Sequence, residues 1–264
     1  NMDAIISEGS SEHQKLLKDY DNIAGYLKQL QEKNIPVLWR PYHEINGGWF
    51  WWGNKGGKVI KLWKIMYDYF TNHHTLNNLL WNWNVNEKNQ WCGSFESHFP
   101  GIDYVDILTV DVYGSYKSSD YTTLKELAQG KPLAFGEVGP YPDPNKIKSS
   151  MPDYTYFLTW GKCIHCGMGD CHAGHCYNST ATVRAVYSND YVVTQDELPD
   201  LQAVAVSPRR YSDNNAVTRP AGIGKIAAVY RLDGSTPANV ALRAATWESM
   251  KPSMAPGTYI IMPM

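Results

Sequence analysis

The chain has 264 residues, a formal net charge of -2 and a sequence pI near 6.5. A chain of this length buries an adequate core in one large α/β domain or in two smaller ones. The near-neutral charge offers no basic surface for nucleic acid, and no apolar run reaches the roughly eighteen residues that a membrane-spanning helix needs. We therefore expect neither a nucleic-acid partner nor a membrane span.

The sequence starts at Asn1 with neither an initiator Met nor a charged-then-apolar leader. Such a start is expected of a mature secreted protein or of a chain trimmed at its N-terminus. Aromatic residues make up 13% of the chain, with ten Trp and eighteen Tyr. This content exceeds what packing usually demands, and Trp and Tyr combine a flat apolar face with a polar tip. We predict a secreted protein with a carbohydrate substrate.

Hydrophobic periodicity predicts five short strands that alternate with helices or long loops. The strands are expected at residues 35–39, 77–84, 104–113, 132–139 and 154–160, and the helices from about residue 10 to 33, 59 to 72 and 122 to 129. The second helix ends at His73-His74, which we interpret as a C-terminal cap in preference to a metal site. Strands that alternate with helices are typical of a parallel sheet or barrel.

Polar or aromatic residues stand at the C-terminal end of every predicted strand. In a (β/α)₈ barrel the whole C-terminal face is the active site, whereas an open sheet uses only the point where its strand order reverses. The fold-class prediction is therefore α/β, and specifically a (β/α)₈ TIM barrel.

The densest pattern is the run from Trp39 to Gly53, in which His43-Glu44 lies just past the first strand. Four aromatic residues follow at 49–52. A packed core segment is the alternative interpretation of such a run, because aromatics bury the most area per residue. The flanking glycines favour a loop instead, and an aromatic loop beside His-Glu favours a binding cleft.

Glycosidic bonds are cleaved between two carboxylic acids, one protonated and one ionised. Glu44 and Glu137 both follow or end predicted strands, so a barrel turns them toward each other across its mouth. A single Glu at a strand end is more often structural or solvated, but two on one face with aromatics between them favour catalysis. His43 and Tyr113 are the expected hydrogen-bond partners that split the two pKa values.

The segments Arg40-Pro41-Tyr42-His43-Glu44-Ile45-Asn46-Gly47-Gly48-Trp49-Phe50-Trp51-Trp52-Gly53 and Phe135-Gly136-Glu137-Val138-Gly139 closely resemble the two signature segments of glycoside hydrolase family 26, best known for endo-β-1,4-mannanases. The resemblance implies that Glu44 is the general acid/base and Glu137 the nucleophile. It implies a retaining mechanism without a cofactor or catalytic metal. The implied sugar-contacting and supporting residues are His43, Trp49, Asp111, Tyr113 and Trp160.

The resemblance covers about residues 10–161 and matches only strands four to eight of the family barrel. An open barrel leaves two unpaired parallel edges and half a core, which opposes stability. We expect residues 1–162 to form a partial catalytic domain and residues 163–264 to pack separately, in a chain that is poorly soluble and weakly active.

After Trp160 the composition changes, and Cys163, Cys166, Cys171 and Cys176 gather with three His. These residues offer zinc ligands, but their short spacing and a secreted setting favour disulfides or unordered thiols. Short strands are expected at 182–187 and 191–194, paired as a hairpin, and at 226–232 and 256–261. They suggest a small β-rich accessory module, although the abrupt change is also compatible with a sequence junction or a reading error. Asn178-Ser179-Thr180 fits a glycosylation acceptor.

The sequence therefore predicts a retaining endo-β-1,4-mannanase that acts on a mannan-type polysaccharide. A β-1,3-xylanase and a mixed-linkage β-glucanase are alternatives within the same family. An alternative from another class is a non-catalytic carbohydrate-binding fragment of a barrel.

Overall fold

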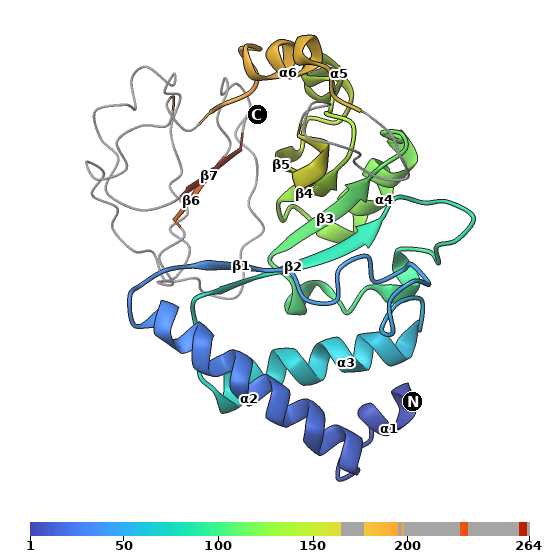
Figure 1. Ribbon diagram of the computed structural model, residues 1–264, viewed down its shortest axis with the longest axis vertical. Helices are drawn as coiled ribbons and strands as arrows, with labels where there is room; N and C mark the ends of the chain where they lie inside the picture. The colour runs from blue at the N-terminus through green and yellow to red at the C-terminus, as the bar shows by residue number, and fades with distance from the viewer. Residues whose placement is uncertain (165–176, 195–196, 198–227, 232–258, 263–264) are drawn as a thin grey trace.

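The computed structural model describes residues 1–164, 177–194, 197, 228–231 and 259–262 (Figure 1). Its centre is a five-stranded parallel sheet in the order β1-β2-β3-β4-β5. The strands are β1 (Val37–Trp39), β2 (Leu79–Asn86), β3 (Ile107–Val112), β4 (Leu133–Val138) and β5 (Tyr154–Thr159). All five predicted strands and their parallel arrangement are confirmed.

The sheet curves as part of a barrel wall and does not close among the described residues. Within this part of the chain, β1 pairs only with β2 and β5 only with β4. Every position of β3 and of β4 is buried, as expected of parallel strands covered on both faces. The open partial barrel predicted from the sequence is therefore confirmed.

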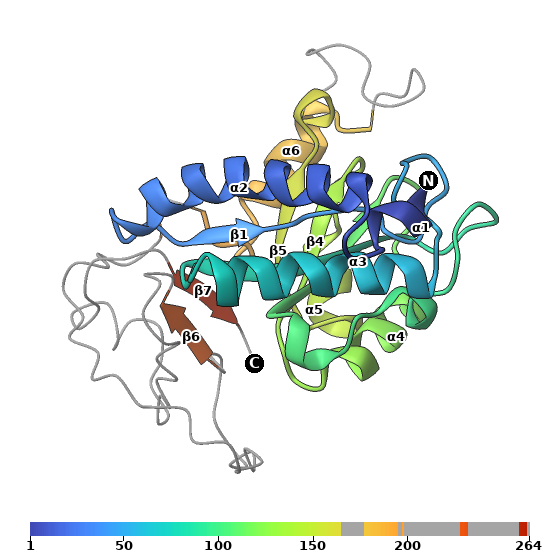
Figure 2. The ribbon, with the colours of Figure 1, turned by 90° about the horizontal axis from the view of Figure 1, so that it is seen from below.

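Two long helical segments cover the outer face of the first two strands (Figures 1 and 2). They are α2 (Ser11–Gln31) and α3 (Gly57–Asp68), and a π-helical turn, η1 (Tyr69–His73), prolongs α3. Helix α2 begins at Ser10, whose side chain accepts a hydrogen bond from the backbone N–H of His13. Both predicted helices are confirmed, and the short α1 (Met2–Ile5) precedes them.

Further helices and 3₁₀ turns connect the strands from β2 onward or follow β5. They are α4 (Ser118–Ala128), which ends where Gln129 and Gly130 adopt positive φ, α5 (Pro144–Ser150) and the 3₁₀ turns η2 (Glu96–His98), η3 (Ile102–Tyr104) and η4 (Gly161–Cys163). The helix predicted near 122–129 is confirmed, although it begins earlier. No helix in the described residues is long and apolar enough to cross a membrane.

The core lies between these helices and the sheet. Large side chains from both layers fill it. They include the fully buried Trp63 of α3, Phe70 of η1 and Trp83 of β2. The Trp63 indole N–H donates to the Tyr104 carbonyl at 3.0 Å, and the Trp83 indole N–H donates to the His98 carbonyl at 3.2 Å. Each buried indole therefore has a partner, as burial of its polar atom requires.

The hairpin predicted over residues 182–194 is wrong. Thr180–Tyr187 forms helix α6, and no strand lies at 191–194. The Ser179 side chain caps the helix by accepting from the Thr182 N–H, and the Tyr187 ring packs on Tyr141 and Phe157. Capping and tertiary packing thus outweigh the strand preference of β-branched residues.

Some of the other predictions about the C-terminal part are confirmed, and the rest lie outside the described residues. β6 (Ala228–Arg231) and β7 (Tyr259–Met262) pair antiparallel, so both of these strands are confirmed. Cys163 is disulfide-bonded, which favours the disulfide interpretation at that position. Cys166, Cys171 and Cys176 lie outside the described residues, and the division of the chain at residue 162 stays a prediction.

Candidate active site

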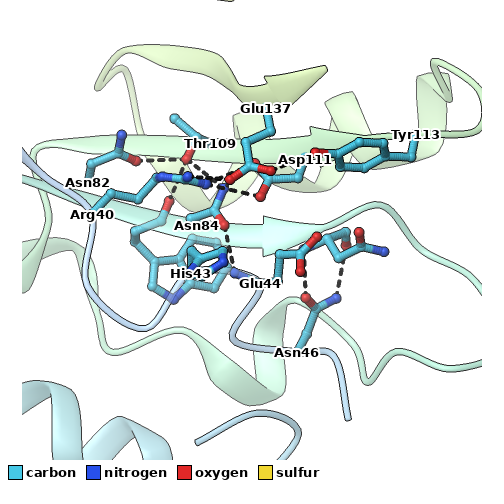
Figure 3. Close-up of polar contacts among 12 residues, drawn as sticks. Arg40, His43, Glu44, Asn46, Asn82, Asn84, Thr109, Asp111, Tyr113 and Glu137 are labelled. Atoms are coloured by element: carbon cyan, nitrogen blue, oxygen red, sulfur yellow. Dashed lines mark hydrogen bonds and ion pairs between the residues drawn. The ribbon is translucent and has the colours of Figure 1, made fainter. Parts of the chain in front are cut away.

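Five of the site residues predicted from the sequence gather at the C-terminal ends of the strands in Figure 3, namely His43, Glu44, Asp111, Tyr113 and Glu137. Asp111 lies within β3 and Glu137 within β4, while Tyr113 follows β3 and Trp160 follows β5. Glu44 lies in the loop after β1. The structure therefore brings both predicted carboxylates to one face of the sheet.

The two oxygens of Glu137 each accept a strong hydrogen bond. Arg40 donates from Nη2 to Oε1 at 2.5 Å, and the Tyr113 hydroxyl donates to Oε2 at 2.7 Å. Burial raises the pKa of Tyr113, and its bond to Glu137 raises it further, so the hydroxyl stays a donor. Charge-assisted donors of this kind stabilise an ionised carboxylate.

Arg40 is a functional residue that the sequence analysis did not assign. Its guanidinium also donates from Nη1 to both oxygens of Asp111, at 3.0 and 3.3 Å. It thus bridges two buried carboxylates. Burial raises the pKa of Asp111, and the charge of Arg40 opposes that rise. One signal in the sequence could have identified Arg40. It directly follows the predicted first strand, so its charge lies on the C-terminal face of the barrel, where a buried charge needs a partner of opposite sign.

A register shift in β4 brings Glu137 beside Asp111. Val110 pairs with Phe135, but Asp111 pairs with Glu137, so Gly136 is the extra residue of a bulge. A Cβ atom at Gly136 would lie 2.5 Å from Asn84 Nδ2 and 2.6 Å from Asp111 Oδ1. Glycine is therefore required there, because the polar side chains of the neighbouring strands pack directly against its Cα.

Glu44 has surroundings unlike those of Glu137. Its carboxylate accepts a hydrogen bond from the Trp49 indole N–H at 2.5 Å. Burial raises the pKa of Glu44; the Trp49 hydrogen bond opposes this rise and the nearby charge of Glu137 adds to it. A carboxyl group with a raised pKa holds its proton at higher pH, which suits a general acid.

The backbone of Glu44 is held in a left-handed conformation, with φ of 50°. Its N–H donates to Asn84 Oδ1 at 2.6 Å. Asn84 in turn donates from Nδ2 to Asp111 at 2.7 Å and to Thr109 Oγ1 at 3.0 Å. Asn84 therefore couples the loop that carries one catalytic candidate to the strand that supports the other (Figure 3).

Buried amides extend this network along β2. Thr109 donates to Asn82 Oδ1 at 2.7 Å, and Asn82 donates to the Tyr156 hydroxyl at 3.1 Å. On the other side, Asn46 accepts from the Asn86 N–H at 2.7 Å and donates to the Asn86 carbonyl at 3.0 Å. Trp and Asn alternate along this strand, but these Asn residues were not among the site residues predicted from the sequence.

The turn that carries Tyr113 is fixed by Glu87, a second residue missed from the sequence. Glu87 is buried at the end of β2 and accepts from the backbone N–H groups of Tyr113 at 3.0 Å, Gly114 at 2.5 Å and Ser115 at 3.3 Å. Tyr113 and Gly114 donate to Oε1, and Lys117 Nζ lies 3.0 Å from Oε2, which also accepts from Ser115. Glu87 therefore positions the tyrosine that holds Glu137.

The remaining predicted residues form the aromatic surroundings of the site. His43 is half-buried, with its ring 4.6 Å from Phe50, and burial together with the charge of Arg40 lowers the pKa of its imidazole. Trp49 and Trp160 are 46% and 45% exposed. The loop interpretation of residues 49–52 is confirmed, and two large rings remain open to a ligand.

The fold and the site together define the class. Parallel strands of a partial (β/α) barrel carry two carboxyl groups at their C-terminal ends, one in a basic setting and one buried beside an indole, with exposed Trp rings nearby. This is the architecture of a glycoside hydrolase. The chain belongs to glycosyl hydrolase family 26, whose model matches residues 1–197.

Similar proteins agree with this assignment. A mannan endo-1,4-beta-mannosidase of Thermothelomyces thermophilus is 38% identical over 205 residues, which cover 75% of this chain and 39% of the relative. Mannan endo-1,4-beta-mannosidase A of Piromyces sp is 34% identical over 203 residues, or 75% of this chain and 31% of the relative. The chain thus spans about a third of the length of these curated relatives.

Solved structures match the same part. GH26A from Muricauda sp. MAR_2010_75 superposes with a TM-score of 0.68 at 42% identity, covering 75% of this chain and 63% of that chain. A beta-mannanase from a symbiotic protist of the termite Reticulitermes speratus, in complex with gluco-manno-oligosaccharide, gives a TM-score of 0.63 at 30% identity, with coverage of 75% and 59%.

Proposed function

We propose that this chain carries the catalytic carboxylates of a secreted, retaining endo-β-1,4-mannanase. The observation that supports this best is the contrast between the two glutamates. Glu137 accepts hydrogen bonds from Arg40 and Tyr113, whereas burial raises the pKa of Glu44. The carboxylate with two strong donors suits the role of nucleophile, and the carboxyl group with the raised pKa suits the role of acid.

In the first step the ionised Glu137 attacks the anomeric carbon of a mannosyl unit. Glu44 transfers its proton to the glycosidic oxygen as the bond from that oxygen to the anomeric carbon breaks. The products are a glycosyl ester on Glu137 and a free sugar leaving group. Arg40 and Tyr113 orient the attacking carboxylate through their bonds to its two oxygens.

In the second step water attacks the anomeric carbon of the ester. Glu44, now ionised, accepts the proton of that water, and Glu137 departs as a carboxylate. Two inversions at the same carbon retain its configuration. The first step leaves Glu44 in the form that the second step needs, so each group returns to its starting state.

The substrate assignment rests on relatives that are named as mannan endo-1,4-beta-mannosidases. The exposed rings of Trp49 and Trp160 suit the apolar CH faces of a polysaccharide. β-1,3-Xylan and mixed-linkage β-glucan are the alternative substrates, because sugar choice in a barrel depends on loops from all of its strands.

One observation favours a second candidate function. The sheet has five strands, and β1 has no partner on its outer side among the described residues. A barrel that lacks part of its wall keeps the aromatic cleft and loses substrate contacts. A non-catalytic carbohydrate-binding fragment is therefore the rival.

The test is to incubate the purified chain with mannan, β-1,3-xylan and lichenan and to follow the release of reducing ends. We expect release from mannan that exceeds release from the other two polymers, and none from the Glu137→Ala variant. Binding to mannan in a pull-down without cleavage would favour the rival function. Preferential cleavage of xylan or lichenan would replace the substrate assignment and leave the mechanism in place.

A further inference from the structure

A cluster of potential metal ligands lies outside the active site, where α2 meets the π-helical turn η1. Its members are Asp21 of α2 and His73 and His74 at the end of η1. One ligand atom from each, namely a carboxylate oxygen and two imidazole nitrogens, lies within 4.8 Å of the others. Since η1 precedes β2, the cluster is at the end of the sheet opposite the catalytic residues.

The π-helical turn explains why three rings meet there. The backbone N–H of His74 bonds the carbonyl of Tyr69, five residues earlier, at 3.0 Å. The rings of Tyr69 and His73 stack with centroids 4.5 Å apart, and the ring of His74 stands at 89° to that of His73 at 4.8 Å. Single π-helical turns inside helices recur at functional sites.

His73 ends η1 and His74 is its C-cap residue, as predicted, and the imidazoles also face the neighbouring helix. The His74 Nε2 atom lies 2.9 Å from Asp21 Oδ1 on the neighbouring helix. Within the described part of the chain, neither imidazole is hydrogen-bonded to a carbonyl of its own helix. The two rings are turned toward α2, where a carboxylate is available.

The carboxylate is oriented for a cation. The Tyr69 hydroxyl donates to Asp21 Oδ1 at 2.8 Å, which is the arrangement that commonly supports a carboxylate ligand of a metal. The Asp21 side chain is 49% exposed and His73 is also exposed, so an ion has access from solvent.

We propose that Asp21, His73 and His74 form a surface site for a divalent transition metal, with Zn²⁺ as the best match. Imidazole nitrogen and carboxylate oxygen are zinc ligands, and three protein ligands leave a fourth position for water. Bound metal cross-links α2 to the α3–η1 segment. These two elements cover the outer face of β1 and β2 (Figures 1 and 2), so the ion stabilises the helical layer without touching the catalytic residues.

A metal-free explanation exists for part of the cluster. The contact between Asp21 and His74, with the Tyr69 hydrogen bond, forms a polar link between the helices by itself. That link does not require His73. Loss of metal binding on removal of the His73 imidazole therefore distinguishes a metal site from a simple ion pair.

The test is calorimetric titration of the full chain with Zn²⁺ after chelator treatment, with thermal unfolding measured in parallel. Wild type is expected to bind one equivalent more than His73→Gln and than Asp21→Asn, and Zn²⁺ should raise its unfolding midpoint by a few degrees more. The matched control is Asp19→Asn, which removes the same charge from an exposed position of α2 and should behave as wild type.

Titrations of His73→Gln and Asp21→Asn that match wild type would overturn the proposal, because other sites would then account for all bound zinc. An equal loss in Asp19→Asn would overturn it too, since it would indicate a general effect of surface charge. Circular dichroism before each titration verifies that the variants are folded, and two variants on different helices keep the result independent of either substitution.

Discussion

Two neighbouring regions of the sheet differ in how fully their groups are paired. They are the C-terminal ends of strands β1 to β4 and the outer edge of β1. At the strand ends, Asn84 connects Glu44 to Asp111, and Arg40 connects Asp111 to Glu137. Along the edge of β1, a strand of three residues, Leu38 is 43% exposed. The geometry of the candidate site therefore depends on contacts within the described strands, whereas the outer edge of β1 has no partner among them.

The largest expected effect comes from removing the proposed nucleophile, Glu137. Glu137→Ala deletes an acceptor of Arg40 and Tyr113 and the group that we propose forms the covalent intermediate. We expect kcat on mannan to fall by roughly four orders of magnitude or more, within the range known for loss of a nucleophile, with KM little changed. Steady-state kinetics measure this. A loss below about tenfold would show that the ordered strand ends are not the catalytic site.

The next effect comes from uncoupling the two halves of the site. Asn84→Ala removes the acceptor for the Glu44 N–H and the donors to Asp111 and Thr109, all of them buried. Buried groups left without partners cost about 1–3 kcal/mol each in stability, and displacement of a catalytic group by about 1 Å reduces the rate about 100-fold. Chemical denaturation measures the loss of stability, and kcat/KM measures the loss of activity. Unchanged activity would show that Glu44 is held by other contacts.

A smaller effect is expected at the turn after β3. Glu87→Gln keeps an acceptor for the N–H groups of Tyr113 and Gly114 but loses the charge that pairs with Lys117. We expect kcat to fall by about three- to tenfold, or roughly 1 kcal/mol of transition-state stabilisation, with KM unchanged. Glu87→Ala should lower kcat further. If Glu87→Gln and Glu87→Ala both had the kcat of wild type, Glu87 would not position Tyr113.

The pH profile sharpens the contrast between the two glutamates. A general acid works while protonated, so activity is present below the pKa of Glu44 and falls as pH rises through it. Because burial raises the pKa of Glu44 and the Trp49 hydrogen bond lowers it, Trp49→Phe should move the alkaline limb of kcat/KM to higher pH. A limb that moves to lower pH, or stays in place, would contradict the assignment of Glu44 as the acid.

The smallest effect on the fold is expected at the exposed edge. Leu38→Lys places a charge on the edge strand, where charges oppose pairing with other chains. We expect the free energy of unfolding to change by less than about 0.5 kcal/mol and light scattering to show less association. Leu133→Lys, at a buried position of β4, is the contrasting variant that should unfold the protein. If wild type and Leu38→Lys associated equally, the chains would associate through a surface other than the edge of β1.

The catalytic face was predictable because its signals are local. The strands are short and rich in apolar residues, and Glu44 and Glu137 stand at or just beyond strand ends within specific motifs. The partners of these glutamates were harder to predict. Arg40 and Glu87 directly follow strands, which suggests a role on this face, but only the register of neighbouring strands shows that each contacts groups far along the chain.

Helix α6 is a case in which the local sequence pattern predicts the wrong element. Thr180, Thr182 and Val183 favour a strand when read locally, but the cap at Ser179 and the packing of Tyr187 decide for a helix. The π-helical turn at Tyr69–His73 was equally hidden, since its sequence continues an ordinary amphipathic helix. In both cases contacts between distant segments select the structure, and a single sequence does not reveal them.

The most direct test of the central claim is to find where a sugar becomes attached to the protein. The chain is incubated with a 2-deoxy-2-fluoro-β-mannosyl fluoride, which slows hydrolysis of the intermediate, and its peptides are mapped by mass spectrometry. We predict one glycosyl ester, on the peptide that contains Glu137, and none in Glu137→Ala. Attachment at Glu44, or cleavage of mannan by a chain that never carries the ester, would contradict the account.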